Sequence, residues 1–125
     1  MDDNRVLIVD DEPSIVISLE YLLGQAGYDV HTASDGQQAL DAVGALRPRL
    51  VLLDAMMPVI NGFEVCRRIR GDPALEGTRI LMLSAKGRDV EINQGLALGA
   101  DAYITKPFAT RELMAAVARL MQPSP

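Results

Sequence analysis

The sequence lacks the features that mark secreted, membrane-bound and nucleotide-binding proteins. It has a single cysteine, Cys66, so no internal disulfide can form and a reducing compartment is favoured. No apolar run approaches the ~20 residues that a membrane span needs, and the first residues, MDDNR, are acidic where a secretory signal is basic. No predicted strand is followed by G-x-G-x-x-G or by a phosphate-binding P-loop, which disfavours dinucleotide and nucleoside-triphosphate sites. We therefore predict a cytoplasmic protein that does not associate with membranes.

Positive charge is also scarce. Twelve basic residues stand against seventeen acidic ones, for a net charge of −5. This charge opposes sequence-independent binding to phosphate backbones, so we predict no direct contact between this chain and nucleic acid. The 125 residues, 49% of them hydrophobic and 23% charged, match one globular domain with a single core.

Five short apolar runs are spaced along the chain. They cover residues 5–9, 28–32, 50–53, 79–83 and 102–105. Runs of this length fit strands that are buried on both faces, as in parallel sheets. The segments between them show helical spacing, and each is long enough for the crossover of about a dozen residues that parallel strands need. The alternation predicts an α/β fold with a doubly wound, five-stranded parallel sheet flanked by five helices.

The first and last helices are predicted from their apolar faces. The first begins at Pro13, which suits the first helical turn, and is expected to end between Gly24 and Gly27. The last covers Thr110 to Met121. The expected buried faces are Ile15, Leu19, Leu22 and Ala26 in the first helix, and Leu113, Ala116, Val117 and Leu120 in the last.

The three middle helices are predicted mainly from their ends. The second covers about 37–46, and the fourth covers about 90–98. In the third, Asn61 is a predicted N-cap and Glu64 follows three residues later, which is a capping-box pattern. Gly95 lies inside the fourth helix and costs about 1 kcal/mol relative to Ala, so we expect that helix to be the least stable.

Acidic residues follow the first and third predicted strands. Asp10 and Asp11 come after residues 5–9, and Asp54 comes after residues 50–53. In an open α/β sheet the functional crevice lies beyond the carboxyl ends of the strands, so neighbouring first and third strands would bring the three carboxylates into one pocket. Carboxylates that close resist joint ionisation unless they share a cation. Oxygen ligands with room for water suit Mg²⁺.

Two further groups lie at strand ends. Ser84 ends the fourth predicted strand, and Lys106 follows the fifth. A carboxylate nucleophile, a divalent cation, an ammonium and a hydroxyl together suit the transfer of a phosphoryl group, because positioning and charge neutralisation supply most of its catalysis. The predicted covalent product is an aspartyl phosphate.

Four motifs carry a resemblance to a known family. They are VDDE after the first strand, DAMMPVINGFEV around Asp54, SAKG after the fourth strand and YITKPF at the fifth. With these motifs in this order, residues 5–121 resemble the receiver domains of bacterial two-component response regulators, such as the chemotaxis receivers. The resemblance implies a flavodoxin-like fold with strand order 2-1-3-4-5. It also implies a receiver domain at 1–122, with 123–125 as a tail or the start of a linker; a stand-alone receiver and an excised module would look the same.

The resemblance assigns roles to individual residues. Asp54 would be the phosphoacceptor, while Ser84 and Lys106 would hold the phosphoryl oxygens. Asp11 and Asp54, with the backbone carbonyl of Met56, would coordinate Mg²⁺, and Asp10 would assist through water. Tyr103 matches the aromatic residue that changes rotamer with Ser84 when the site is filled, and the Lys106–Pro107 bond is expected to be cis, which is a minority state for X–Pro bonds.

The implied function is a switch. A sensor histidine kinase or a histidine phosphotransfer protein would donate the phosphoryl group, and the chain would catalyse only its own phosphorylation and dephosphorylation. The face formed by the fourth helix, fifth strand and fifth helix would then control a downstream effector or a fused output domain. The chain would be a monomer or a phosphorylation-promoted dimer, although Ala102 stands where DNA-binding family members often have an acid for dimerisation.

Other interpretations of the same residues were weighed. The acids could be solvated strand ends, Ser84 a helix cap and Tyr103 a core aromatic. Met56, Met57 and Cys66 fit packing better than ligation. A Mg²⁺-dependent aspartyl phosphatase would need a second Asp as general acid at the position of Met56. A pseudo-receiver that binds partners without phosphorylation is disfavoured by the complete acid, hydroxyl and lysine set.

Overall fold

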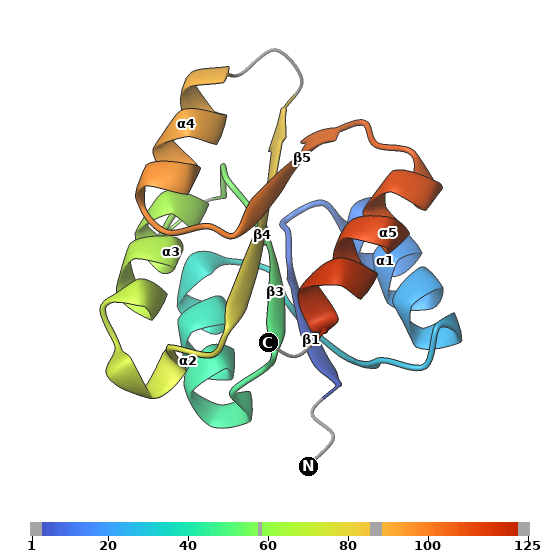
Figure 1. The fold of residues 1–125 in the computed structure, drawn as a ribbon, viewed down its shortest axis with the longest axis horizontal. Helices are drawn as coiled ribbons and strands as arrows, with labels where there is room; N and C mark the ends of the chain where they lie inside the picture. Colours follow the sequence, from blue (N-terminus) through green and yellow to red (C-terminus); the bar gives the residue numbers. More distant parts are fainter. Residues whose placement is uncertain (1–3, 58, 86–88, 123–125) are drawn as a thin grey trace.

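The protein, described here by a computed structural model at residues 4–57, 59–85 and 89–122, contains a five-stranded parallel sheet (Figure 1). The strand order is β2-β1-β3-β4-β5, which confirms the predicted flavodoxin-like fold. The expected tail, 123–125, lies outside the described residues. The strands are β1 (Arg5–Val9), β2 (Asp29–Ala33), β3 (Leu50–Asp54), β4 (Arg79–Ala85) and β5 (Ala102–Lys106). The helices are α1 (Pro13–Gln25), α2 (Gly36–Leu46), α3 (Gly62–Arg70), α4 (Asp89–Ala97) and α5 (Thr110–Met121), with a short 3₁₀ helix, η1 (Pro73–Leu75).

Helices cover both faces of the sheet, as its continuous apolar strands predict (Figure 1). Alternate strand residues point to opposite faces, so Leu7 and Val51 pack under α2 and α3 on one side. Ile8 and Leu52 pack under α1 and α5 on the other side. The result is a three-layer sandwich in which β1 and β3 occupy the centre.

The strands extend further toward their carboxyl ends than the apolar runs indicate. Asp54 is the last residue of β3 and Ser84 is next to last in β4, so their predicted placement at strand ends is confirmed, whereas Lys106 is the last residue of β5 and not the residue after it. Cα pairing continues through Asp54 with Leu83 and through Ala85 with Lys106. The ladder therefore fixes the backbone of these polar residues, which apolar pattern alone does not reveal.

The buried face of α1 differs from the prediction. Leu19 and Leu23 are its buried residues, whereas Leu22 is only half-buried and Ala26 is an exposed C-cap. The helix ends at Gln25, between Gly24 and Gly27 as predicted. In α5, by contrast, the expected face of Leu113, Ala116, Val117 and Leu120 is buried, and the prediction is confirmed.

Of the two hydrogen bonds of the predicted capping box, one is present at the start of α3. The Asn61 side chain accepts a hydrogen bond from the Glu64 N–H at 3.0 Å, as expected. The Glu64 carboxylate does not return to the Asn61 backbone, because it binds Arg67 and, at 2.8 Å, Arg68. Ion pairing within the helix replaces the second half of the box.

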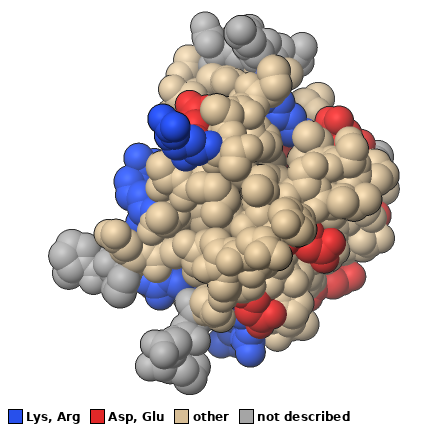
Figure 2. Space-filling model, turned by 90° about the vertical axis from the view of Figure 1, so that its right-hand side faces the viewer, with Lys and Arg blue, Asp and Glu red and all other residues tan. Residues whose placement is uncertain are grey.

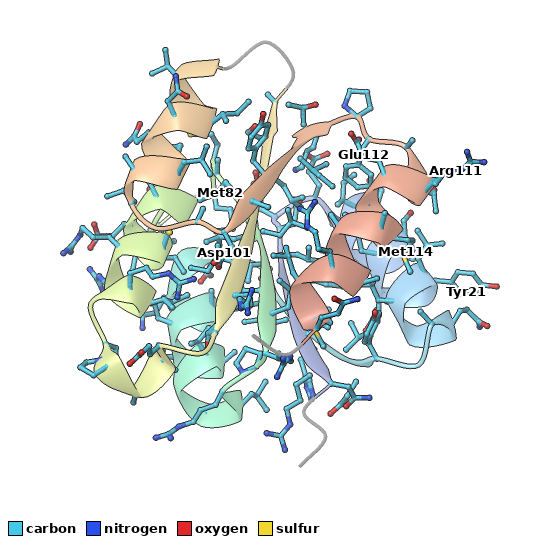
Figure 3. All side chains as sticks on the ribbon, in the orientation of Figure 1. Tyr21, Met82, Asp101, Arg111, Glu112 and Met114 are labelled. Atoms are coloured by element: carbon cyan, nitrogen blue, oxygen red, sulfur yellow. The ribbon has the colours of Figure 1, made fainter. Side chains whose placement is uncertain are left out.

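Gly95 has a packing role that the sequence did not indicate. It is buried against Met82 of β4, which is labelled in Figure 3. A Cβ built on Gly95 would lie 3.4 Å from Cε of Met82 and 3.8 Å from the ring of Phe63. The glycine therefore allows close approach of α4 to the sheet.

No helix in the described part of the chain is both long enough and apolar enough to cross a membrane. Figure 2 looks onto the side of α1 and α5, where uncharged side chains form most of the surface. On α1, Ile17 and Tyr21 contribute side chains that are 67% and 65% exposed.

Candidate functional site

Three carboxylates meet at the carboxyl ends of β1 and β3. Because these strands are neighbours, with Val9 opposite Leu53, Asp10, Asp11 and Asp54 each place an oxygen within 4.8 Å of the others. Asp10 and Asp54 are buried, whereas Asp11 is exposed. The structure thus confirms the predicted convergence of these three acids.

Lys106 extends from β5 into this acidic cluster. Its Nζ lies 2.7 Å from Asp10 Oδ2 and 3.6 Å from Asp54 Oδ1. Burial acts to lower the pKa of Lys106, but its hydrogen bond to Asp10 and the charge of Asp54 outweigh burial and raise it. The ammonium is therefore charged at neutral pH. The Lys106–Pro107 peptide bond is cis, as expected.

Asp54 is poorly stabilised as an anion in this setting. Burial, followed by repulsion from Asp10, raises the pKa of Asp54 from 3.8 to about 7, despite the opposing charge of Lys106 and the hydrogen bond from the Met56 N–H. That hydrogen bond is long, at 3.3 Å to Oδ1. One ammonium does not fully offset the clustered negative charge, so the site is suited to a further cation.

A cavity of about 290 Å³ opens onto the cluster. Its lining residues come from the ends of four strands and the loops after them. They are Asp11, Glu12, Asp54, Met56, Ala85 and Lys106. The small side chain of Ala85 leaves access to Asp54.

Met56 lies at the rim of the cavity and is 54% exposed, so the packing interpretation is wrong for this methionine. It is confirmed for Met57 and Cys66, which are buried in the core.

Ser84 and Tyr103 are not among the residues that line the cavity. Ser84 is buried within β4, so the helix-cap interpretation is wrong, and its Oγ has no hydrogen-bond partner in the described part of the chain. Tyr103 on β5 is 45% exposed, so it is not a core aromatic. An unpartnered buried hydroxyl is unfavourable, which leaves Ser84 able to gain a hydrogen bond if an acceptor enters the site.

Glu12 is a site residue that the sequence analysis missed. Its carboxylate lines the cavity and lies 3.4 Å from the Nζ of Lys106, while its N–H donates to Asp10 Oδ1 at 2.9 Å. Glu12 occupies the N-cap of α1 without making a side-chain cap. The third acid of the VDDE motif was the available signal, but the direction of its side chain could not be inferred from pattern.

Gly62 fixes the loop that follows Asp54. Its N–H donates to Ala55 O at 2.9 Å, and a Cβ built on it would lie only 2.1 Å from the backbone oxygen of Asp54. The glycine is therefore needed for close approach of α3 to β3. In the same loop, Val59 has a φ of 71°, which is costly for a β-branched residue.

The donor set fits Mg²⁺. Carboxylate oxygens dominate, water has access through the cavity, and the raised pKa of Asp54 shows that added positive charge would be favourable. Asp11 and Asp54 present oxygens at the cavity, and Asp10 lies behind them against Lys106.

Comparison with known proteins identifies one family model and many relatives. The model described as "Response regulator receiver domain" matches residues 6–118. The chain is 45% identical over 122 residues to the alkaline phosphatase synthesis transcriptional regulatory protein PhoP of Bacillus subtilis. That match covers 98% of this chain and 50% of PhoP, so the chain spans about half the length of this relative.

Solved structures share the fold closely. A putative response regulator from Chloroflexus aurantiacus has a TM-score of 0.90 and 35% identity, with 94% of this chain and 97% of that one covered. The receiver domain of the sensor histidine kinase PA1611 from Pseudomonas aeruginosa has a TM-score of 0.86 and 29% identity, with 94% and 97% covered. That receiver domain has a magnesium ion coordinated in its active site cleft.

Proposed function

Because the chain belongs to the family of response regulator receiver domains, we propose that it is a phosphorylation-dependent switch whose phosphoacceptor is Asp54. The observation that carries this proposal is the placement of Asp54. Its carboxylate lines an open cavity, is flanked by two further acids and lies 3.6 Å from the ammonium of Lys106. A nucleophile, room for a phosphoryl group and neutralising charge occur together at one point.

The reaction transfers one phosphoryl group. An Asp54 oxygen forms a bond to phosphorus while the bond from phosphorus to the donor's histidine nitrogen breaks, and the released imidazole takes a proton from solvent. Lys106 turns from Asp10 toward the new phosphoryl oxygens, and the Ser84 hydroxyl gains the acceptor that it lacks. Without a general acid at Met56, the chain catalyses only its own phosphorylation and dephosphorylation.

The magnesium described for the Pseudomonas receiver supports a divalent cation in this site. Asp11, Asp54 and the backbone carbonyl of Met56 would hold Mg²⁺, with Asp10 acting through water. Bound there, the ion supplies charge neutralisation for the transferred group.

The signal would be read on the face formed by α4, β5 and α5. As Ser84 moves toward the phosphoryl group, space opens beside β5 and the exposed ring of Tyr103 turns inward. An effector or attached output domain that prefers the altered face would shift the equilibrium between the two states.

Partners follow from the same proposal. The donor is a sensor histidine kinase or histidine phosphotransfer protein, and the exposed Ile17 and Tyr21 on α1, near Glu12 at the cavity, offer it an apolar contact. Residues 1–122 form the receiver domain, which acts in the cytoplasm as a monomer or a phosphorylation-promoted dimer. It does not bind nucleic acid itself; any output like that of the transcriptional regulator PhoP would reside in another domain.

The test is incubation with Mg²⁺ and acetyl phosphate, followed by intact-mass measurement. Wild type and Asp41→Asn, which removes an acid from α2 outside the cavity, should each gain one phosphoryl group. Asp54→Asn should gain none. If Asp54→Asn gained the adduct as readily as wild type, the assignment of the acceptor would be wrong.

A further inference from the structure

A second cavity lies at the amino-terminal edge of the sheet, away from Asp54. It has a volume of about 220 Å³ and is formed by the turn after α2 and the turn after α3, both at the lower end of Figure 1. Its lining residues are Arg47, Pro48, Arg49, Ala74, Gly77 and Thr78. Two guanidinium groups therefore border one hollow in a protein whose net charge is −5.

Arg49 is held in place by contacts on three sides. Its N–H donates to Arg5 O at 3.0 Å, and its carbonyl accepts from the N–H of Arg79 at 2.8 Å. Its side-chain Nε donates to Met121 O at 2.8 Å, across 72 residues of sequence. Both Nη groups make no hydrogen bond to any residue that the structure describes. The planar guanidinium thus presents two fixed donors, and little entropy remains to be lost on binding.

Arg47 supplies the second charge. It is the C-cap of α2 in the left-handed region, with φ 46° and ψ 60°, a position where glycine is usual. Within the described residues, neither Arg47 nor Arg49 has a carboxylate within ion-pair distance, although Glu76 lies in the adjoining turn. Most other described basic residues, such as Arg70 with Asp101, are paired. Arg111 and Arg119 also lack an ion-pair partner among the described residues, but neither lines this cavity, so Arg47 and Arg49 differ from them in sharing one hollow.

The cavity wall also offers a backbone donor. The N–H of Gly77 has no acceptor within the described part of the chain, whereas the Thr78 hydroxyl is already committed to Pro48 O at 3.1 Å. No aromatic side chain lines the cavity, so nothing is available to stack on a base. The available chemistry is two guanidinium forks and one N–H, which together match oxygen atoms of a dianion.

We propose that the cavity between Arg47 and Arg49 binds a phosphate-class oxyanion, either free inorganic phosphate or the terminal phosphate of a nucleotide whose remainder stays in solvent. Two unpaired positive charges balance a phosphate dianion better than a single carboxylate. Because Arg49 also holds the carbonyl of Met121, an anion there would act on the end of α5. This site is separate from the Asp54 cavity, so it does not rest on the proposed phosphorylation.

The test is an NMR titration of amide resonances with sodium phosphate at pH 8, without Mg²⁺, with sodium chloride at equal ionic strength as reference. We expect saturable shifts at Gly77 and Thr78, with smaller shifts at Met121 and Gln122, and a dissociation constant in about the millimolar range. Arg47→Gln should weaken binding at least about fivefold, since one of two charge-assisted contacts is lost.

Two further variants distinguish the effect of guanidinium geometry on phosphate binding from the effect of positive charge alone. Arg49→Lys keeps the charge but loses the planar fork, so it should also weaken binding. Arg111→Gln removes one positive charge from the start of α5, where Figure 3 shows the side chain pointing away from the molecule, and should leave binding unchanged. Because the Arg47 side chain makes no hydrogen bond within the described residues, Arg47→Gln should fold normally.

Three results would overturn the proposal. The first is a set of amide shifts that sodium chloride reproduces. The second is a dissociation constant for phosphate that is unchanged in Arg47→Gln. The third is a loss of phosphate affinity in Arg111→Gln that equals the loss in Arg47→Gln. A parallel titration with ADP distinguishes the two sources. Equal shifts at Gly77 and Thr78 with phosphate and with ADP would identify the phosphate group as the determinant. Shifts with phosphate alone would identify free phosphate, and shifts with ADP alone that Arg47→Gln weakens would identify the terminal phosphate of a nucleotide.

Discussion

At the scale of single residues, the dominant feature is a carboxylate placed where its charge is unfavourable. Asp54 is 7% exposed and lies beside Asp10, so ionising it in the folded protein costs free energy that is absent in the unfolded chain. Lys106 reduces this cost without removing it. The same arrangement that suits Asp54 to cation binding therefore lowers the stability of the protein.

Asp54→Asn should make the protein more stable at pH 8 and leave it nearly unchanged near pH 4. Burial raises the pKa of Asp54 in the folded protein to about 7, from an ordinary value of 3.8, so wild-type stability falls as the pH rises between these two values. The pKa shift of about three units, at about 1.4 kcal/mol per unit, limits the stability lost through ionisation of Asp54 to about 4 kcal/mol. Asparagine cannot ionise, so it avoids this loss.

Urea unfolding of both proteins at pH 4.5 and pH 8 measures the effect. Addition of Mg²⁺ at pH 8 should stabilise wild type more than Asp54→Asn, because a cation offsets the ionised carboxylate. Equal pH dependence in the two proteins would contradict the prediction.

Glu12→Gln should speed phosphorylation by acetyl phosphate. The Glu12 carboxylate repels an anionic donor at the cavity and competes for Lys106 at 3.4 Å. Removing one charge at this range should raise the rate by about threefold to tenfold at low salt. Glu20→Gln removes the same charge from an exposed position of α1 outside the cavity and serves as the control.

The measurement is the rate of adduct formation by intact mass at two salt concentrations. The gain for Glu12→Gln should shrink as salt rises. A rate equal to that of Glu20→Gln at low salt would count against the prediction.

At the scale of elements, two glycines of the helices illustrate opposite constraints. Gly62 begins α3 against the backbone of Asp54, where any Cβ would overlap. Gly44 lies exposed inside α2, with no atom within 4 Å of a built Cβ. One glycine sets the distance between a helix and the sheet, and the other only weakens its helix.

Gly62→Ala should destabilise the protein by more than about 2 kcal/mol, because backbone atoms 2.1 Å away must shift. Gly44→Ala should stabilise it by about 0.5–1 kcal/mol through helix propensity. The denaturant midpoints of the two variants, compared with that of wild type, show whether Gly62→Ala is less stable and Gly44→Ala more stable. If Gly62→Ala proved as stable as Gly44→Ala, the close contact of α3 with β3 would be wrong.

Sequence reasoning predicted the elements and the site with unequal success, for physical reasons. Burial on both faces gives each strand an apolar run that pattern reveals, and parallel topology brings Asp10, Asp11 and Asp54 to one edge. Side-chain direction follows tertiary packing instead. Hence the contact of Glu12 with Lys106 and the burial of Leu23 required the structure.

At the scale of the whole molecule, the site and the reading face are connected through β4 and β5. Ser84 is buried on β4 and pairs with Thr105 of β5. Thr105 follows the exposed Tyr103 by two residues on the same strand. A displacement of Ser84 toward the cavity therefore reaches Tyr103 through adjacent strands. The proposed switch therefore involves only these two neighbouring strands between Ser84 and Tyr103.

Phosphorylation should reduce the exposure of Tyr103. The chain has three tyrosines and no tryptophan, so acrylamide quenching of tyrosine fluorescence reports on few groups. Quenching should fall when Mg²⁺ and acetyl phosphate are added to wild type, and should change little in Tyr103→Phe or in Asp54→Asn. A fall of the same size in Tyr103→Phe would rule out this ring as its source.

The contact of Gly95 with Met82 has a mechanical consequence. No side chain of Gly95 projects into a hole of the sheet, and the surface beneath it is a flexible thioether (Figure 3). At this position α4 presents backbone, and not a side chain, to the sheet. A lateral shift of α4 here would first meet the thioether of Met82, which can change rotamer to accommodate it.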